Sequence, residues 1–170
     1  FIDYSEFPDF DLSIDGVLGI DYGYTNDSTA VVLVFKKNDK LYIHEILYSK
    51  GLTNQDIVEI IAEKNYLDVL TYADSAEPKS IEEMKRLGML IKPAVKGQGS
   101  VMAGISKLKE FEIYVSNQSI NIKREYNAYY WQQLKDGTII NKPVDRENHA
   151  MDAIRYAVYS NYGKAENFFV

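Results

Sequence analysis

Short apolar runs near the start of the chain are typical of β-strands. Residues 17–22, 29–36 and 40–48 each form such a run, and Val31–Phe35 is apolar throughout. Asn38–Asp39 separates the second run from the third and favours a tight hairpin turn. We therefore expect three consecutive strands that pair antiparallel.

From residue 53 the apolar period changes, and helices are expected to alternate with short strands. Thr53 is a suitable N-cap for a first helix at about 54–65. Three further helices are predicted at about 78–87, 100–110 and 118–127, the last of them capped by Ser116 or Asn117. The final helix is predicted to begin after Pro143, with Asp145 as its cap, and to end at about Tyr162. The short strands are predicted at 67–72, 89–91, 111–115 and 129–132.

This order predicts an α/β fold with a mixed sheet, three antiparallel strands followed by parallel strands, flanked by helices. A right-handed crossover would place the strand at 67–72 beside the first strand and parallel to it. We expect an N-terminal arm or linker at 1–16, one folded domain at 17–163 and a C-terminal tail at 164–170.

Composition supports one globular domain. The chain has 170 residues, of which 46% are hydrophobic, enough for a sizeable core. No apolar run approaches the roughly 18–20 residues of a membrane span, so we expect no membrane partner and no signal peptide. Cysteine is absent and His44 and His149 are the only histidines, which excludes thiolate zinc sites and leaves oxygen ligands for a hard metal.

Charge is unevenly distributed. The net charge is −6, yet residues 1–30 hold seven acids and no Lys or Arg, whereas residues 79–124 hold nine bases against four acids. A basic surface facing an acidic site is one interpretation, and an ordinary solvated face is the other.

Three separated aspartates carry the candidate chemistry. Asp21 closes the first strand, Asp74 follows the strand at 67–72, and Asp152 lies in the last helix among core residues. Burying a carboxylate is costly unless a cation compensates it, so a shared divalent metal site that hydrolyses phosphodiesters is the simplest common explanation. The predicted topology places Asp21 and Asp74 at neighbouring strand ends, and Asp152 shares a helix stripe with His149 and Tyr156 that can face them.

The first two aspartates also have ordinary structural interpretations. Asp21 could bond local amides in a strand-end turn. Asp74 could cap the helix that begins near Pro78. Glu77 could be a fourth ligand or simply an acid in the first turn of that helix.

The last helix offers similar alternatives. Asp152 could form an i,i+3 ion pair with Arg155. His149 could be a ligand, a proton shuttle, an orienting partner or a structural residue.

A glycine-rich loop and two lysines are candidate contacts for DNA. The loop Lys96–Ser100 lacks Walker spacing, so it does not predict an ATPase. Lys96, Gly97 and Gly99 could instead contact a DNA backbone, and Lys79 could reach a phosphate or face water.

Four segments, taken together and in this order, resemble the C-terminal nuclease domain of tailed-phage terminase large subunits. They are Gly19–Gly23, Ala73–Ser80, Tyr129–Gly137 and Asp145–Ala157, the last of which reads Asp-Arg-Glu-Asn-His-Ala-Met-Asp-Ala-Ile-Arg-Tyr-Ala. The second and last segments are the specific ones. The resemblance spans roughly residues 17–160.

The resemblance implies an RNase H-like fold and an endonuclease that cuts concatemeric double-stranded viral DNA. It implies Asp21, Asp74 and Asp152 as the metal-binding acids, with His149 nearby, and we expect two Mg²⁺ or Mn²⁺ ions. The implied partners are an N-terminal packaging ATPase domain, the terminase small subunit and the portal protein. The implied location is the host cell cytoplasm.

Three other functions stay open at this point. Another RNase H-like nuclease, such as a Holliday-junction resolvase or a transposase, would carry the same acids. Asp21-x-Gly23 followed by Thr25-Asn26 also resembles the first phosphate loop of actin-like and sugar-kinase ATPases, which need a second such loop and a duplicated domain. A non-catalytic DNA-docking module would leave the three acids unexplained.

Overall fold

The computed structural model describes residues 3–7, 15–23, 25–144 and 146–163. Seven strands form one mixed sheet in the order β1-β7-β4-β3-β2-β5-β6. They are β1 (Ser5–Phe7), β2 (Val17–Asp21), β3 (Thr29–Lys37), β4 (Lys40–Ser49), β5 (Thr71–Ala73), β6 (Ile91–Pro93) and β7 (Glu112–Ser116). A separate hairpin consists of β8 (Trp131–Gln133) and β9 (Ile139–Pro143).

Strand pairing follows the topology expected from the sequence. β2, β3 and β4 pair antiparallel in chain order. β5 pairs parallel with β2, with Ile20 opposite Ala73, as a right-handed crossover requires. β1 pairs parallel with β7, so part of the segment predicted as an arm forms the edge of the sheet.

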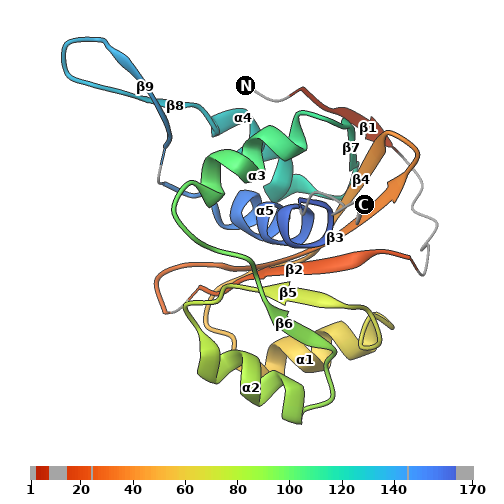
Figure 1. Ribbon diagram of the computed structural model, residues 1–170. Helices are drawn as coiled ribbons and strands as arrows, with labels where there is room; N and C mark the ends of the chain where they lie inside the picture. The colour runs from red at the N-terminus through yellow and green to blue at the C-terminus, as the bar shows by residue number, and fades with distance from the viewer. Residues whose placement is uncertain (1–2, 8–14, 24, 145, 164–170) are drawn as a thin grey trace, which may run out of the picture.

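Helices cover both faces of the sheet (Figure 1). They are α1 (Asn54–Glu63), α2 (Pro78–Arg86), α3 (Ser100–Leu108), α4 (Ile120–Ala128) and α5 (His149–Tyr162). Alternate strand residues point to opposite faces, so Val17 and Val32 join the core beneath α3, α4 and α5, whereas Leu18 and Leu33 join the core beneath α1 and α2.

The starts of the helices agree with the sequence in part. Thr53 caps α1, and its hydroxyl accepts a hydrogen bond from the Asp56 N–H at 3.1 Å. The caps predicted for α4, Ser116 and Asn117, are wrong. Ser116 still belongs to β7, and the N-cap is Ser119, whose side chain forms no hydrogen bond to the start of the helix. The cap predicted for α5, Asp145, lies outside the described residues.

The sequence predicts the bounds of the short strands less accurately than those of the long ones. The predicted strand at 67–72 is regular only from Thr71 to Ala73, because the apolar residues before it pack on the core as a loop. The strand at 89–91 is shifted to Ile91–Pro93. β9 was not predicted, and its hairpin with β8 extends away from the body of the domain (Figure 1).

No helix in the described part of the chain is long and apolar enough to cross a membrane.

Candidate active site

Asp21, the last residue of β2, is a buried carboxylate. It is 7% exposed, and burial raises its pKa from 3.8 to about 6. The hydrogen bond from His149 opposes this rise, whereas the charges of Asp152 and Asp74 add to it. Three acids therefore share this region, and Asp21 carries the largest burden of desolvation.

Asp74 directly follows β5 and lies at the same edge of the sheet. Its backbone N–H donates to the carbonyl of Ile20 at 3.1 Å, which continues the β2–β5 ladder up to the two carboxylates. Its Oδ1 accepts a hydrogen bond from the Ala76 N–H at 3.0 Å and pairs with the ammonium of Lys96. The alternative in which Asp74 caps α2 is wrong, because Glu77 is the N-cap there.

Asp152 is brought to this edge by close packing of α5 on β2. A Cβ on Gly19 would lie 2.0 Å from the carbonyl oxygen of Ala153 and 3.1 Å from the Cβ of Ala157. Only a glycine allows the helix backbone to approach the strand this closely. The alanines on this side of the helix are fully buried.

The side chain of Asp152 forms the ion pair that the sequence suggested. Its Oδ1 accepts a hydrogen bond from Arg155 Nη2 at 2.9 Å. This pair does not exclude a second role, because Asp152 still raises the pKa of Asp21.

His149 begins α5 and contacts Asp21. Its Nδ1 lies 3.0 Å from Asp21 Oδ2, and its Nε2 lies 3.9 Å from Asp27 Oδ1. The hydrogen bond to Asp21 raises the pKa of His149, although partial burial opposes that rise. The imidazole is thus a hydrogen-bond partner of Asp21 in this structure.

Tyr156 is the common neighbour of the three carboxylates. This residue is 4% exposed, and its pKa is raised first by burial and then by the charges of Asp21, Asp152 and Asp74. All three acids are therefore near enough for their charges to act on one ring. Within the described ranges, however, no three acidic or histidine side chains are close enough to hold a metal ion as they stand.

Each carboxylate instead has a basic partner of its own. Asp21 faces His149, Asp74 faces Lys96, and Asp152 faces Arg155. The carboxylates would have to turn away from these partners to coordinate one ion together. The fold brings the three carboxylates to one edge of the sheet, but their oxygens are not arranged to coordinate a metal ion together.

The other predicted residues lie at different distances from this cluster. Lys96, a predicted DNA contact, is exposed but already pairs with Asp74, and its Nζ lies 5.3 Å from the centre of the Tyr156 ring. Gly97 and Gly99 are exposed at the start of α3, with no atom within 4 Å of an added Cβ. Lys79 and Glu77 are exposed at the start of α2.

Sequence analysis missed one residue that supports the site. Glu125 of α4 is 2% exposed, and both of its oxygens accept the N–H of Ala150 at 2.9 Å. It also accepts the N–H of Met151 at 3.3 Å. Glu125 therefore supplies the side-chain cap that Asn148, the N-cap of α5, does not. Burial raises its pKa from 4.5 to about 7.

Nothing in the sequence marks Glu125 as buried. It follows Lys123 and Arg124 in a polar stretch and reads as part of a solvated helix face. Its partners on α5 are 25 residues further along the chain, beyond the reach of a local pattern.

Comparisons with known proteins identify the family of this chain. The family model described as "Terminase RNAseH like domain" matches residues 21–160. The large terminase subunit of Bacillus phage SPP1 is 31% identical over 145 residues, which cover 82% of this chain and 34% of that protein. The PBSX phage terminase large subunit of Bacillus subtilis is also 31% identical, over 82% of this chain and 33% of its own length.

Solved structures give the same result for the fold. The nuclease domain of the SPP1 large terminase, determined with bound manganese, superposes with a TM-score of 0.77 at 30% identity and covers 84% of each chain. The large terminase of the thermophilic bacteriophage D6E superposes with a TM-score of 0.75 at 20% identity, over 92% of this chain and 43% of that one, which shows the fold alone. The predicted RNase H-like fold is confirmed. The chain spans about a third of the length of the curated relatives it matches.

Proposed function

We propose that this chain, which belongs to the family of terminase RNase H-like domains, is a divalent-metal-dependent endonuclease domain acting on double-stranded DNA. The observation that carries the proposal is that β2, β5 and α5 bring Asp21, Asp74 and Asp152 to one edge of the sheet, where the charges of Asp74 and Asp152 act on Asp21. One of these carboxylates is buried and the other two are half-buried, and a bound cation would compensate their shared negative charge.

The residues present fit a hard divalent cation. All three candidate ligands offer carboxylate oxygens, which Mg²⁺ and Mn²⁺ prefer over nitrogen or sulfur. The pKa of Asp21 is raised even though His149 donates to it, so His149 alone does not offset the desolvation of the carboxylate. A bound cation would stabilise the ionised form. When bound here, two Mg²⁺ or Mn²⁺ ions would polarise the scissile phosphate and lower the pKa of the attacking water.

The side chains around the acids have separate tasks in this proposal. With Nδ1 donating to Asp21 Oδ2, His149 orients that carboxylate and leaves Nε2 free to accept a proton. Lys96 and Arg155 neutralise Asp74 and Asp152 until a metal ion replaces them. No side-chain nucleophile is required.

DNA would be held mainly through its phosphates. Lys79, Lys96 and the amides of Gly97 and Gly99 are the proposed contacts, and such binding is sensitive to salt and indifferent to sequence. The proposed biological substrate is concatemeric viral DNA in the host cytoplasm. In the longer protein this domain would act beside an N-terminal packaging ATPase domain, with the small subunit and the portal as partners.

Plasmid cleavage tests the proposal. We expect the wild type to cut with Mn²⁺ or Mg²⁺ but not with EDTA. Asp21→Asn, Asp74→Asn and Asp152→Asn should each lower the rate about 100-fold, because each removes charge that stabilises the transition state. The exposed Asp68→Asn is the matched control and should cut like wild type. Cleavage in EDTA, or undiminished cleavage by all three site variants, would exclude this mechanism.

A further inference from the structure

We propose that the cavity between the start of α3 and the Asp152–Arg155 pair is a second, non-reacting phosphate site, which holds a backbone phosphate of the bound DNA. The inference rests on the proposed nuclease function and adds a position for the strand beside the reacting phosphate. The main support is the position of Arg155, which the sequence suggested only as an ion-pair partner of Asp152.

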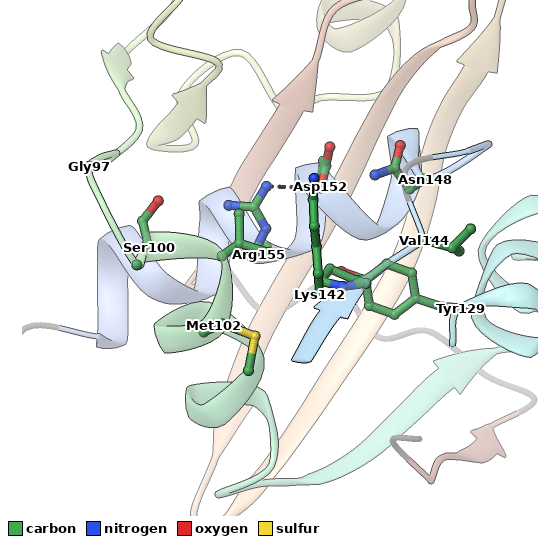
Figure 2. A pocket seen from close by; sticks show the side chains of 12 residues that line it. Gly97, Ser100, Met102, Tyr129, Lys142, Val144, Asn148, Asp152 and Arg155 are labelled. Carbon is green, nitrogen blue, oxygen red and sulfur yellow. Dashed lines mark hydrogen bonds and ion pairs between the residues drawn. The ribbon is translucent and has the colours of Figure 1, made fainter. Parts of the chain in front are cut away.

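The cavity has a volume of about 360 Å³ and opens beside the candidate active site. Gly97, Gly99 and the first turn of α3 form one wall, and residues 142–144 at the end of β9 form the opposite one. Tyr129 and the start of α5 complete the lining. Figure 2 shows the guanidinium of Arg155 turned toward Asp152, between the start of α3 and Lys142.

Arg155 presents a buried guanidinium whose hydrogen bonds are incomplete. The residue is 6% exposed, and its Nη2 donates to Asp152 at 2.9 Å. Its Nε has no hydrogen-bond partner among the described residues. A guanidinium carries five N–H donors in a planar fork that matches a phosphate, so this side chain has donors left for a ligand.

The packing around Arg155 holds this group in place. A Cβ on Gly104 of α3 would lie 2.4 Å from Arg155 Cγ, so the glycine leaves room for the aliphatic stem. The ring of Tyr156 lies 5.0 Å from the guanidinium carbon. The cation is thus set at the cavity wall by its surroundings before any ligand arrives.

The start of α3 offers a second set of donors from a different element. Gly99 is the N-cap of this nine-residue helix and, as a glycine, has no side chain with which to cap it. The first N–H groups of a helix lack partners within the helix and favour anions, and here they adjoin the cavity that Arg155 lines. Lys142 adds a third positive group at the rim.

These donors favour a DNA phosphate over a neutral ligand. The negative charge of Asp152 is balanced by Arg155. The net positive potential of the cavity therefore comes from Lys142 and from the N-terminal end of the α3 dipole. Val101 and Met102 add apolar wall, which suits the deoxyribose attached to a phosphate. A phosphate held here lies beside Asp152, where the strand would continue from the reacting phosphate.

Duplex binding in EDTA tests the site without cleavage. Gly97→Asp places a carboxylate at the rim without a steric clash, since an added Cβ there has no neighbour within 4 Å. Arg155→Lys keeps the stem and the charge but loses the fork. We expect both variants to bind a fluorescent duplex about tenfold more weakly. Only Gly97→Asp, which adds a negative charge, should also lower the salt slope by about one. Ser106→Asp, exposed on α3 outside the cavity, is the control of equal charge and should stay within twofold of wild type.

Nuclear magnetic resonance titrations separate the possible sources of the phosphate. Inorganic phosphate and the duplex should each shift the amides of Val101 and Met102 in the wild type, and neither should do so in Gly97→Asp. Shifts with inorganic phosphate alone would overturn the DNA assignment, and shifts with neither probe would overturn the site. A wild type that shows both shifts but never cuts plasmid would refute the nuclease and leave this site standing.

Discussion

At the level of single residues, the acids were predictable and most of their partners were not. Asp21, Asp74 and Asp152 stand out in sequence because each interrupts or ends an apolar segment. The Arg155 partner is local, three residues along one helix, and was recognised as an alternative. Lys96 is 22 residues from Asp74, so only the folded chain reveals that pair. His149 was expected near the acids, but its hydrogen bond to Asp21, 128 residues away, was not predicted.

Glu125 should make stability depend on pH near neutrality. Its pKa is raised in the folded protein from 4.5 to about 7, so the native state holds this proton more tightly than the unfolded chain does. Stability should therefore fall as pH rises from about 4.5 to 7. Glu125→Gln keeps a carbonyl acceptor for the α5 amides but cannot ionise.

Urea unfolding at pH 5 and pH 8 measures this effect. Relative to wild type, the free energy of unfolding of Glu125→Gln should rise by about 1–3 kcal/mol between the two pH values. Asp21 also has a raised pKa, but it is present in both proteins and cancels from the difference. Equal pH dependence of the two proteins would contradict the buried, ionisable Glu125 described here.

At the level of elements, long periodic segments were predicted well and short ones were not. The three antiparallel strands and the buried face of α5 follow directly from apolar patterning. β5 and β6 have three residues each, too few for a pattern to fix their ends. The contact of α5 with Gly19 links two such well-predicted elements, yet their register on each other could not be read from the sequence.

Gly19→Ala should destabilise the domain sharply. The new methyl would meet the backbone of Ala153 rather than a flexible side chain, so α5 would have to move away from β2. Overpacking of this kind costs about 1–3 kcal/mol, and each kcal/mol lowers the Tm of a domain this size by roughly 2–4 °C.

Thermal melting with a matched alanine substitution measures that cost. Gly97→Ala is the control, because a Cβ there has open space around it. It should melt within about 2 °C of wild type. A Gly19→Ala protein that melts with the control would show that α5 does not rest on the strand backbone.

At the level of the whole molecule, the architecture was predicted because topology rules leave few arrangements for this order of elements. The β8–β9 hairpin escaped prediction because its strands bury little, and Ile139 is 66% exposed. The charge asymmetry was visible in the sequence, but its link to the acids was not. One base of the positive segment, Lys96, lies at the acidic cluster itself.

Divalent cations should raise the Tm, with opposite changes in two variants. Binding at 100 times the dissociation constant stabilises the folded state by about 2.7 kcal/mol. Asp74→Asn removes a ligand and should cancel much of the shift seen with Mn²⁺. Lys96→Ala removes the ammonium that competes for Asp74 and should enlarge the shift.

Calorimetry with EDTA or millimolar Mn²⁺ provides the measurement. Lys92→Ala, an exposed lysine of β6, is the control and should respond like wild type. Identical melting of the wild type in both buffers would argue against a metal site built from these acids.

The contact between Gly19 and the helix above it has a consequence for variation in the domain. Main-chain atoms of Gly19 and Ala153 meet at this contact, with only the methyl group of Ala157 beside them, so the separation of Asp21 from Asp152 depends little on the size of larger packed side chains. Substitutions among the aliphatic residues of the core can then change the stability of the domain while the spacing of the two acids stays nearly the same.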